Sequence, residues 1–177
     1  TRSLSSAASD VYKRQDITVV PPSTSAKEIE ALKPDGIFLS NGPGDPKVLT
    51  SAVNEVKEMM KLEIPIFGIC LGHQIMSLAY DLKIEKMPFG HHGANHPVHD
   101  LKNNTVFITS QNHNFAVAEV EDRADISITH KSLFDGSIQG IEHCEKPFYS
   151  IQCHPEASPG PKEFEVLFER FFEDMNA

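Results

Sequence analysis

Three short apolar runs in the first half of the chain alternate with stretches whose apolar residues recur at helical spacing. The third run, residues 64–69, is apolar throughout, which is typical of a strand buried on both faces. Strands that alternate with helices indicate an α/β fold, because parallel strands are joined by crossover helices. We therefore predict a mainly parallel open sheet flanked by helices. The predicted strands are residues 16–20, 35–40 and 64–69.

Helices are expected between these strands and after them. Ser25 offers an N-cap with Glu28 three residues later, and Pro34 ends that helix. A second helix precedes the third strand, another begins after Cys70, and an amphipathic helix closes the chain. The apolar residues at helical spacing are Val53, Val56 and Met60 in the second helix, Leu71, Ile75, Leu78 and Leu82 in the third, and Phe164, Leu167, Phe168, Phe171, Phe172 and Met175 in the last.

The pattern changes between residues 84 and 152 to short β runs separated by turn residues. Examples are "TVFIT", "ISITH", "SIQGI" and "FYSIQ". This half is expected to form a small antiparallel extension together with late strands of the main sheet. With 177 residues, 40% of them hydrophobic, the chain is long enough for one such domain and too short for two.

Charge and cysteine content narrow the class of protein. The net charge of -9 and the absence of a Lys/Arg run argue against a nucleic-acid surface or an anionic membrane surface. No apolar stretch reaches the ~20 residues that cross a bilayer, and the start lacks the apolar centre of a signal peptide. We therefore expect a cytoplasmic protein. Its three cysteines have no CxxC spacing and are expected to be free thiols.

Cys70 lies in the sequence "FGICLGHQ", at the junction of a predicted strand and a predicted helix. A strand, a tight turn containing G-x-C-x-G and a helix have the form of a nucleophile elbow, in which glycines let the backbone pass closely. The carboxyl end of a strand is where open α/β sheets bind ligands, and a helix N-terminus favours a thiolate. The alternative is that Cys70 is a small buried hydrophobe.

A thiolate that attacks a substrate needs a base and an oxyanion site. In "SIQCHPEASPGP" a β run ends shortly before His154 and Glu156, which could serve as base and as the group that orients it. In "SNGPGDP" glycine-rich backbone follows another strand and could face an oxyanion. Each motif alone is explained by a surface histidine or an ordinary loop. Together they fall at strand ends and complement one another chemically.

Four histidines in "FGHHGANHPVHD" raise the question of a metal site. No cysteine or spaced carboxylate completes a familiar ligand set around them, and thiolate chemistry needs no metal. We therefore expect no metal. The residues concerned are His91, His92, His96 and His99.

The pair "GICLGHQ" and "HPE" resembles the class I, or triad, glutamine amidotransferases. Longer segments resemble the glutaminase domain of the small subunit of carbamoyl-phosphate synthase. They are "FLSNGPGDP", "FGHHGANHPV", "QNHNFAV", "THKSLFDGSIQGI" and "HPEASPGP", and the resemblance runs from about residue 16 to the end. It implies a flavodoxin-like class I amidotransferase fold and an enzyme that forms C–N bonds with glutamine as amido donor.

The resemblance also implies roles for individual residues. Cys70 would attack the side-chain amide of glutamine, His154 would shuttle the proton and Glu156 would hold the imidazole. Water would then release glutamate from the thioester. Asn114 stands where the family often has glycine, and we retain it because asparagine tolerates left-handed dihedrals. The positions that carry over for glutamine and oxyanion binding are Gly42, Gly44, Leu71, Gln74, Asn112, Asn114 and Phe115.

The same resemblance implies a partner. The ammonia would pass to a large synthetase subunit that makes carbamoyl phosphate from bicarbonate and ATP, for arginine and pyrimidine synthesis. ATP and Mg²⁺ are expected on that subunit, and no cofactor is expected in this chain. The histidine-containing segment would be a structural loop near the subunit interface.

Residues 1–15 do not look like the first strand and helix of such a domain, so we expect an unrelated or disordered start followed by an amidotransferase domain at 16–177. The family's N-terminal domain and first strand are then missing, which would leave the strand at 64–69 or at 16–20 with an unpaired edge. One alternative is the amidotransferase of another synthase, such as anthranilate or aminodeoxychorismate synthase; "HHGANHP" and "HKSLFDG" count against it. The other is a non-catalytic activating module, which the retained Cys70, His154 and Glu156 disfavour.

Overall fold

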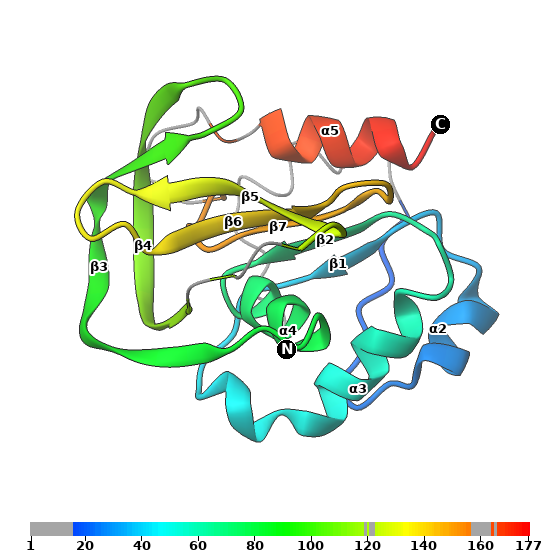
Figure 1. The fold of residues 1–177 in the computed structure, drawn as a ribbon. Coiled ribbons are helices and arrows are strands. Elements are labelled where there is room, and N and C mark those ends of the chain that lie inside the picture. Colours follow the sequence, from blue (N-terminus) through cyan, green and yellow to red (C-terminus); the bar gives the residue numbers. More distant parts are fainter. Residues whose placement is uncertain (1–15, 119, 121–122, 157–163, 165) are drawn as a thin grey trace.

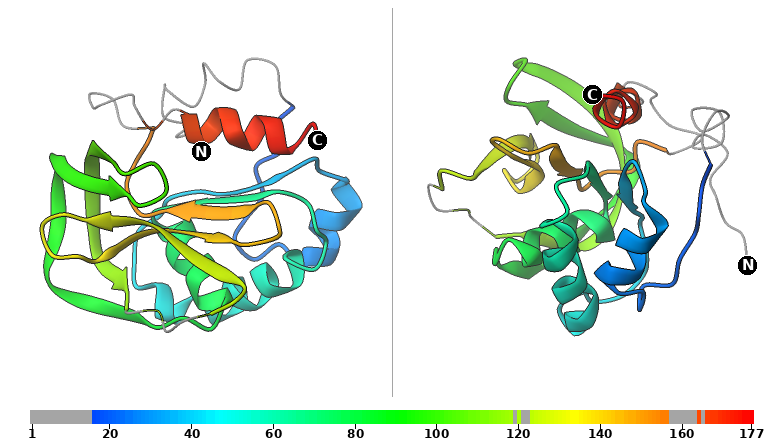
Figure 2. Two further views of the ribbon diagram at one scale, coloured as in Figure 1. Left: turned by 45° about the horizontal axis from the view of Figure 1, so that its top comes forward. Right: turned by 90° about the vertical axis from the view of Figure 1, so that its right-hand side faces the viewer.

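One mixed sheet of seven strands organises the described part of the chain, as Figure 1 shows. The computed structural model describes residues 16–118, 120, 123–156, 164 and 166–177. Helices α2 (Ala26–Leu32), α3 (Thr50–Met59) and α4 (Leu71–Ala79) lie on one face of the sheet, and α5 (Val166–Asp174) lies on the other (Figure 2). A short 3-10 helix, η1 (Pro46–Val48), precedes α3. The α/β class predicted from the sequence is therefore confirmed.

The strands follow the order β1-β2-β7-β6-β4-β3-β5 across the sheet. Only the pairs β1–β2 and β2–β7 are parallel among the described pairings, so the predicted mainly parallel sheet is wrong. A parallel pair needs a crossover, which α3 provides between β1 and β2, whereas the chain after α4 turns back on itself in antiparallel pairs. The strands are β1 (Ile37–Leu39), β2 (Ile66–Ile69), β3 (Ile84–Asp100), β4 (Thr105–Val117), β5 (Ile126–Ser132), β6 (Ile138–His143) and β7 (Phe148–Ile151).

The strand predicted at residues 16–20 is absent. These residues have no regular secondary structure, and Ile17 and Val19 are exposed. The predicted unpaired edge of residues 64–69 is wrong as well, because β2 pairs with β1 on one side and with β7 on the other. The prediction of an unrelated start falls on residues 1–15, which lie outside the described residues, and stays a prediction.

The first helix begins as its sequence predicts. The Ser25 hydroxyl accepts a hydrogen bond from the Glu28 main-chain N–H, and the Glu28 carboxylate accepts one from the Ser25 main-chain N–H at 2.8 Å. Each side chain therefore satisfies a donor at the helix start that has no partner within the helix. The helix ends at Leu32, followed by Lys33 in the left-handed conformation directly before Pro34.

The long strand β3 is the element that the sequence pattern missed. Its 17 residues include the histidine-containing segment that was expected to be a loop. The ladder with β4 is interrupted between Lys86 and His91 and again between Gly93 and His96. Gly93 has a φ of 136°, which a residue with a side chain rarely adopts. Because of its bulges, its glycines and its polar residues, this segment lacks the apolar alternation by which a strand is predicted from sequence.

The closing helix α5 packs on the sheet through aromatic side chains, as predicted. Phe168 and Phe171 are buried, and their rings lie 5.5 and 5.9 Å from that of Phe67 in β2. Phe172, which the predicted stripe included, is exposed. Among the described residues, no helix is both long enough and apolar enough to cross a membrane.

Candidate active site

Cys70 occupies a strained turn between β2 and α4. Its φ and ψ are 53° and -102°, outside the regions that non-glycine residues normally adopt. A Cβ at Gly72 would lie 2.1 Å from the carbonyl oxygen of Leu39, and one at Gly68 would lie 2.9 Å from the carbonyl carbon of Gly72. Both glycines are therefore required by close backbone contact. The strand, tight turn and helix predicted from the sequence form an elbow, and strain of this kind is common at functional sites.

The ends of two parallel strands bring Cys70 and His154 to the same edge of the sheet. Ile69, the last residue of β2, pairs with Ile151, the last residue of β7. The Cys70 N–H donates to the Ile151 carbonyl at 2.9 Å, and the His154 N–H donates to the Ser110 carbonyl in β4 at 2.9 Å. The nucleophile candidate and the base candidate are therefore fixed through main-chain hydrogen bonds.

His154 and Glu156 form a hydrogen-bonded pair. The distance from His154 Nδ1 to Glu156 Oε1 is 2.8 Å, and both side chains are largely buried. Burial lowers the pKa of His154, but its interactions with the Cys70 side chain and with Glu156 raise it, with a net rise to about 10. The ring therefore carries a proton at neutral pH.

The contact between Cys70 and His154 is close but is not a well-formed hydrogen bond. His154 Nε2 is buried and makes no hydrogen bond within the described residues, whereas the Cys70 side chain is among the groups that raise the pKa of His154. The two observations are compatible, because the hydrogen bonds of a catalytic group are often long without substrate and tighten when it binds. A thiolate beside a protonated imidazole can attack an acyl carbon and protonate the group that leaves.

The glycine-rich loop lies beside the residue that follows Cys70. A Cβ at Gly42 would lie 2.8 Å from Leu71 Cδ2, so the loop and the start of α4 are in contact. Gly44 has a φ of 110°, and the Asp45 carboxylate accepts from the Lys47 N–H at 2.9 Å. The structure thus brings together Gly42 and Leu71, two of the residues predicted for the oxyanion site.

Gln74 connects α4 to β4 and to the end of β7. Its Nε2 donates to the Phe115 carbonyl at 2.9 Å and to Gln152 Oε1 at 3.0 Å. His113 Nδ1 also donates to the Phe115 carbonyl, at 2.8 Å. Burial lowers the pKa of His113 to about 4, so this ring is neutral near pH 7. Gln74 and Phe115, two of the residues predicted to bind glutamine, are therefore in hydrogen-bond contact, while His113 and Gln152 are contacts that sequence reasoning missed.

The side chains of Asn112 and Asn114 contact His92 and not Gln74. Both are exposed, and their Oδ1 atoms lie 3.0 and 3.2 Å from the two ring nitrogens of His92 in β3. Asn114 belongs to an extended strand and does not have the positive φ for which we retained it. A Cβ at Gly90 would lie 2.4 Å from Asn114 Oδ1, so the asparagine side chain packs directly over that glycine.

The buried face of α4 is more polar than its apolar spacing indicates. His73 is fully buried, and its Nδ1 lies 2.8 Å from Ser150 Oγ in β7. Burial, together with the charges of His113 and His130, lowers the pKa of His73 to about 3, so this imidazole is neutral. The sequence did not predict that this polar face is the buried one. The apolar residues predicted to face the core were three leucines and an isoleucine, because their helical spacing is more regular. Of these, Leu71, Ile75 and Leu78 are only partly buried.

The histidines of β3 take part in contacts between strands. The ring of His91 lies 5.0 Å from that of His96 and 5.0 Å from that of His113, and its Nε2 lies 3.0 Å from Asp135 Oδ2. His99 Nε2 lies 3.0 Å from Asn104 Oδ1. Within the described ranges, no three histidine, cysteine or carboxylate side chains are arranged to hold a metal ion.

The three cysteines are free thiols, as predicted. Cys144 is exposed, whereas Cys153 is buried in the same apolar cluster as Cys70. Burial raises the pKa of the Cys153 thiol, and the neighbouring Glu156 raises it further. Cys153 therefore stays protonated.

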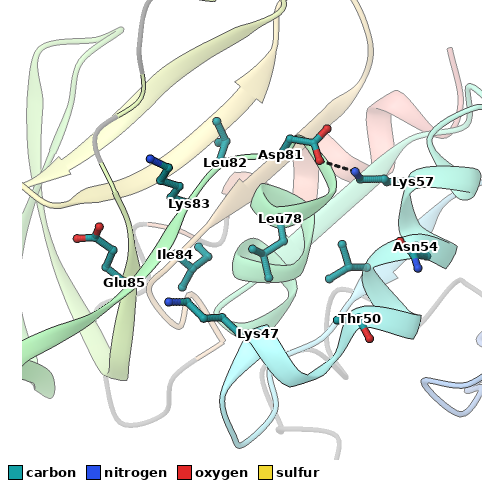
Figure 3. Close-up of a pocket in the computed structure, with 11 residues that line it drawn as sticks. Lys47, Thr50, Asn54, Lys57, Leu78, Asp81, Leu82, Lys83, Ile84 and Glu85 are labelled. Atoms are coloured by element: carbon teal, nitrogen blue, oxygen red, sulfur yellow. Dashed lines mark hydrogen bonds and ion pairs between the residues drawn. The ribbon is translucent and has the colours of Figure 1, made fainter.

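A separate surface cavity of about 510 Å³ lies at the other end of α4 from Cys70 (Figure 3). It is lined by α3, by the end of α4 and by the start of β3, and an ion pair between Lys57 and Asp81 spans its rim. No residue predicted for the active site lines this cavity. Its volume therefore says nothing about the chemistry at Cys70.

Comparison with known proteins shows which family the chain belongs to. The profile of the family "Glutamine amidotransferase class-I" matches residues 4–174. The carbamoyl phosphate synthase small chain of Buchnera aphidicola is 57% identical over 159 residues, which are 90% of this chain and 40% of that one. The small chain of Pseudomonas putida is 56% identical, over 90% of this chain and 42% of its own length. That of Escherichia coli K12 is 54% identical, over 89% of this chain and 41% of its own length. The chain thus spans about two fifths of the length of these relatives.

Solved structures show the same fold at low identity. A Thermoplasma acidophilum protein, provisionally described as part of a GMP synthase, has a TM-score of 0.81 at 20% identity, covering 99% of this chain and 89% of that one. A glutamine amidotransferase of Thermotoga maritima has a TM-score of 0.61 at 16% identity, and the match covers 78% of this chain and 77% of that one. These two likenesses concern the fold alone. The match of the family profile to residues 4–174, nearly all of the sequence, shows the family: the chain belongs to the class I glutamine amidotransferases.

Proposed function

We propose that this chain is the glutaminase domain of a carbamoyl-phosphate synthase. The observation that carries the proposal is the elbow cysteine beside a histidine whose Nδ1 lies 2.8 Å from a buried carboxylate. Relatives at 54–57% identity described as carbamoyl phosphate synthase small chains support the choice of synthase. In this proposal Cys70, His154 and Glu156 are the catalytic residues.

The chemistry is an acyl transfer in two steps. The Cys70 thiolate attacks the side-chain amide carbon of glutamine, and the C–N bond breaks as His154 gives its proton to the departing ammonia. Water, deprotonated by the now neutral His154, then attacks the thioester and releases glutamate and the thiolate. Glu156 keeps Nδ1 of the ring protonated and directs Nε2 toward the sulfur.

The negative charge that develops on the amide oxygen needs fixed donors. We assign these to the main chain at Leu71 and in the loop that contains Gly42 and Gly44, supported by the contact between Gly42 and Leu71. Glutamine itself would lie against Gln74 and the β4 segment that includes Phe115. Asn112 and Asn114 stay candidates for the same site, through the main chain for Asn114.

The ammonia is proposed to pass to a large synthetase subunit that combines it with bicarbonate and ATP. ATP and Mg²⁺ would bind on that subunit, so this chain's own residues carry out only the hydrolysis. The support is the description of the relatives as small chains, a term that applies to those proteins.

The test is glutamine hydrolysis by the full-length protein, followed as glutamate release, with and without a synthetase large subunit. Hydrolysis that increases with the large subunit, together with carbamoyl phosphate formation from glutamine, supports the proposal. A protein that hydrolyses glutamine but supports only another synthase would overturn the choice of partner. Absence of hydrolysis under both conditions would overturn the enzyme assignment itself.

A further inference from the structure

A fully buried glutamine, Gln152, lies between the end of β7 and His154. Its side chain is 0% exposed, and its main-chain N–H donates to the Gln139 carbonyl at 2.7 Å. Its Oε1 accepts from Gln74 Nε2 at 3.0 Å, the only hydrogen bond of this side chain within the described residues. A buried amide with one of its two ends unpaired is uncommon and requires an explanation.

The main chain fixes which way the Gln74 amide points. The Phe115 carbonyl can only accept hydrogen bonds, so the Gln74 atom 2.9 Å from it must be the nitrogen. The second hydrogen of that NH₂ group is directed at Gln152, whose facing atom must then be the oxygen. Both hydrogens of Gln74 are therefore used inside the protein. Its Oε1 makes no hydrogen bond to a described residue and is not a buried unpaired atom.

We propose that Gln152 is a positioning residue that turns the carbonyl oxygen of Gln74 toward bound glutamine, where it accepts a hydrogen bond from the α-ammonium group of the substrate. The inference rests on the proposed glutaminase function. A free acceptor attracts a cationic donor, and the two hydrogen bonds that Gln74 Nε2 donates prevent the amide from presenting its NH₂ end instead. Gln152 thereby contributes to the choice of an amino acid over a simple amide without contacting either.

The experiment compares glutamine with glutaric acid monoamide, which is glutamine without its α-ammonium group. In the wild-type full-length protein, kcat/KM should favour glutamine. Gln152→Met removes the acceptor at similar volume and should raise KM for glutamine about tenfold, the effect of one hydrogen bond to a charged group. Its kcat, and both constants for the monoamide, should change by less than about threefold. Gln152→Glu keeps an acceptor oxygen and should restore the preference.

A matched control is available in the same protein core. Gln139 is also fully buried, and its Oε1 accepts from Gln111 Nε2 at 2.9 Å, so Gln139→Met removes a similar bond that does not involve Gln74. This variant should retain the preference for glutamine even if its stability falls. Equal losses for both substrates in Gln152→Met, or an unchanged preference, would overturn the proposal.

A second measurement keeps the proposal testable if Gln152→Met does not fold. In a crystal structure of the Cys70→Ser protein with glutamine, Gln74 Oε1 should lie within about 3.2 Å of the substrate's α-nitrogen. An α-ammonium group bound elsewhere would overturn the inference. A wild-type protein that does not hydrolyse glutamine contradicts the proposed function instead, so the two failures are distinguishable.

Discussion

Replacing Gly72 with alanine tests whether the elbow is held by close backbone contact. The new Cβ would lie 2.1 Å from the carbonyl oxygen of Leu39 and 2.7 Å from its carbon, where non-bonded heavy atoms normally stay about 3.5 Å apart. The obstacle is main chain of β1, which cannot move aside as a flexible side chain could. The first turn of α4 must therefore shift away from the sheet by roughly 1 Å.

Two consequences of this shift can be measured. Overpacking of this kind costs about 1–3 kcal/mol or more, which outweighs the gain of about 1 kcal/mol from replacing a helical glycine. We therefore expect the urea midpoint of Gly72→Ala to fall. Cys70 directly precedes this turn, and a displacement of about 1 Å in an active site can reduce the rate about a hundredfold. We expect kcat for glutamine hydrolysis to fall by that order in the protein that remains folded.

Gly44→Ala serves as the stability control. Its φ of 110° is unfavourable for alanine, but a Cβ there meets no atom within 4 Å. Gly44→Ala therefore strains the backbone without producing a steric clash. It should lower the urea midpoint less than Gly72→Ala does. A Gly72→Ala protein with wild-type stability and wild-type kcat would show that α4 and β1 are not in the contact described.

Four further outcomes are expected of the site. Cys70→Ser should keep the fold, seen by circular dichroism, and lose glutamine hydrolysis, because an alcohol is a far weaker nucleophile; near-normal turnover would remove Cys70 from the mechanism. His154→Asn should lower kcat more than Glu156→Gln, which still offers a hydrogen bond to the ring; equal and negligible effects would make this segment a simple turn. Glu156 helps to raise the pKa of His154 to about 10, so Glu156→Gln should move the alkaline fall in kcat/KM to lower pH, and an unmoved profile would contradict that role. Asn114→Gly removes the contact with His92 and should leave kcat within about threefold if only the main chain binds substrate, whereas a hundredfold loss would indicate a side-chain role.

The raised pKa of His154 also sets the sign of its effect on stability. Because the folded-state pKa of about 10 exceeds the ordinary value of 6.5, the stabilisation from protonated His154 is complete below about pH 6.5 and is lost as pH rises through about 10. Urea unfolding between pH 7 and 10.5 should show wild-type stability falling more steeply than that of His154→Asn. Parallel curves would contradict the assignment of this proton.

Residues of the candidate site could be proposed from the sequence wherever they lie in short local patterns. Glycines that flank a cysteine at a strand end, and a histidine two residues before a carboxylate, need no knowledge of distant contacts. The orientation of Gln74 depends instead on Phe115 and Gln152, which come from two other parts of the sheet. Burial of His73 likewise depends on Ser150 in β7, and no helical periodicity reveals it.

The strands that are short and apolar could be predicted from the sequence. A strand of polar residues, which forms because neighbouring strands pair with it, could not. β2 has four fully buried residues and was found from its sequence alone. β3 is polar and bulged, and becomes a strand because β4 and β5 pair with it. Residues 16–20 show the reverse case, since this β-like sequence pairs with no strand of the described part of the chain and forms none itself.

The placement of β7 between β2 and β6 has a consequence for synthesis of the protein. Among the described strands β7 comes last along the chain, yet it is inserted between β2 and β6 in the middle of the sheet. Long-range pairing of this kind forms late in folding. A nascent chain that already displays Cys70 therefore lacks His154 and Glu156, so the pair that we propose to activate the thiol is assembled only once β7 has been inserted.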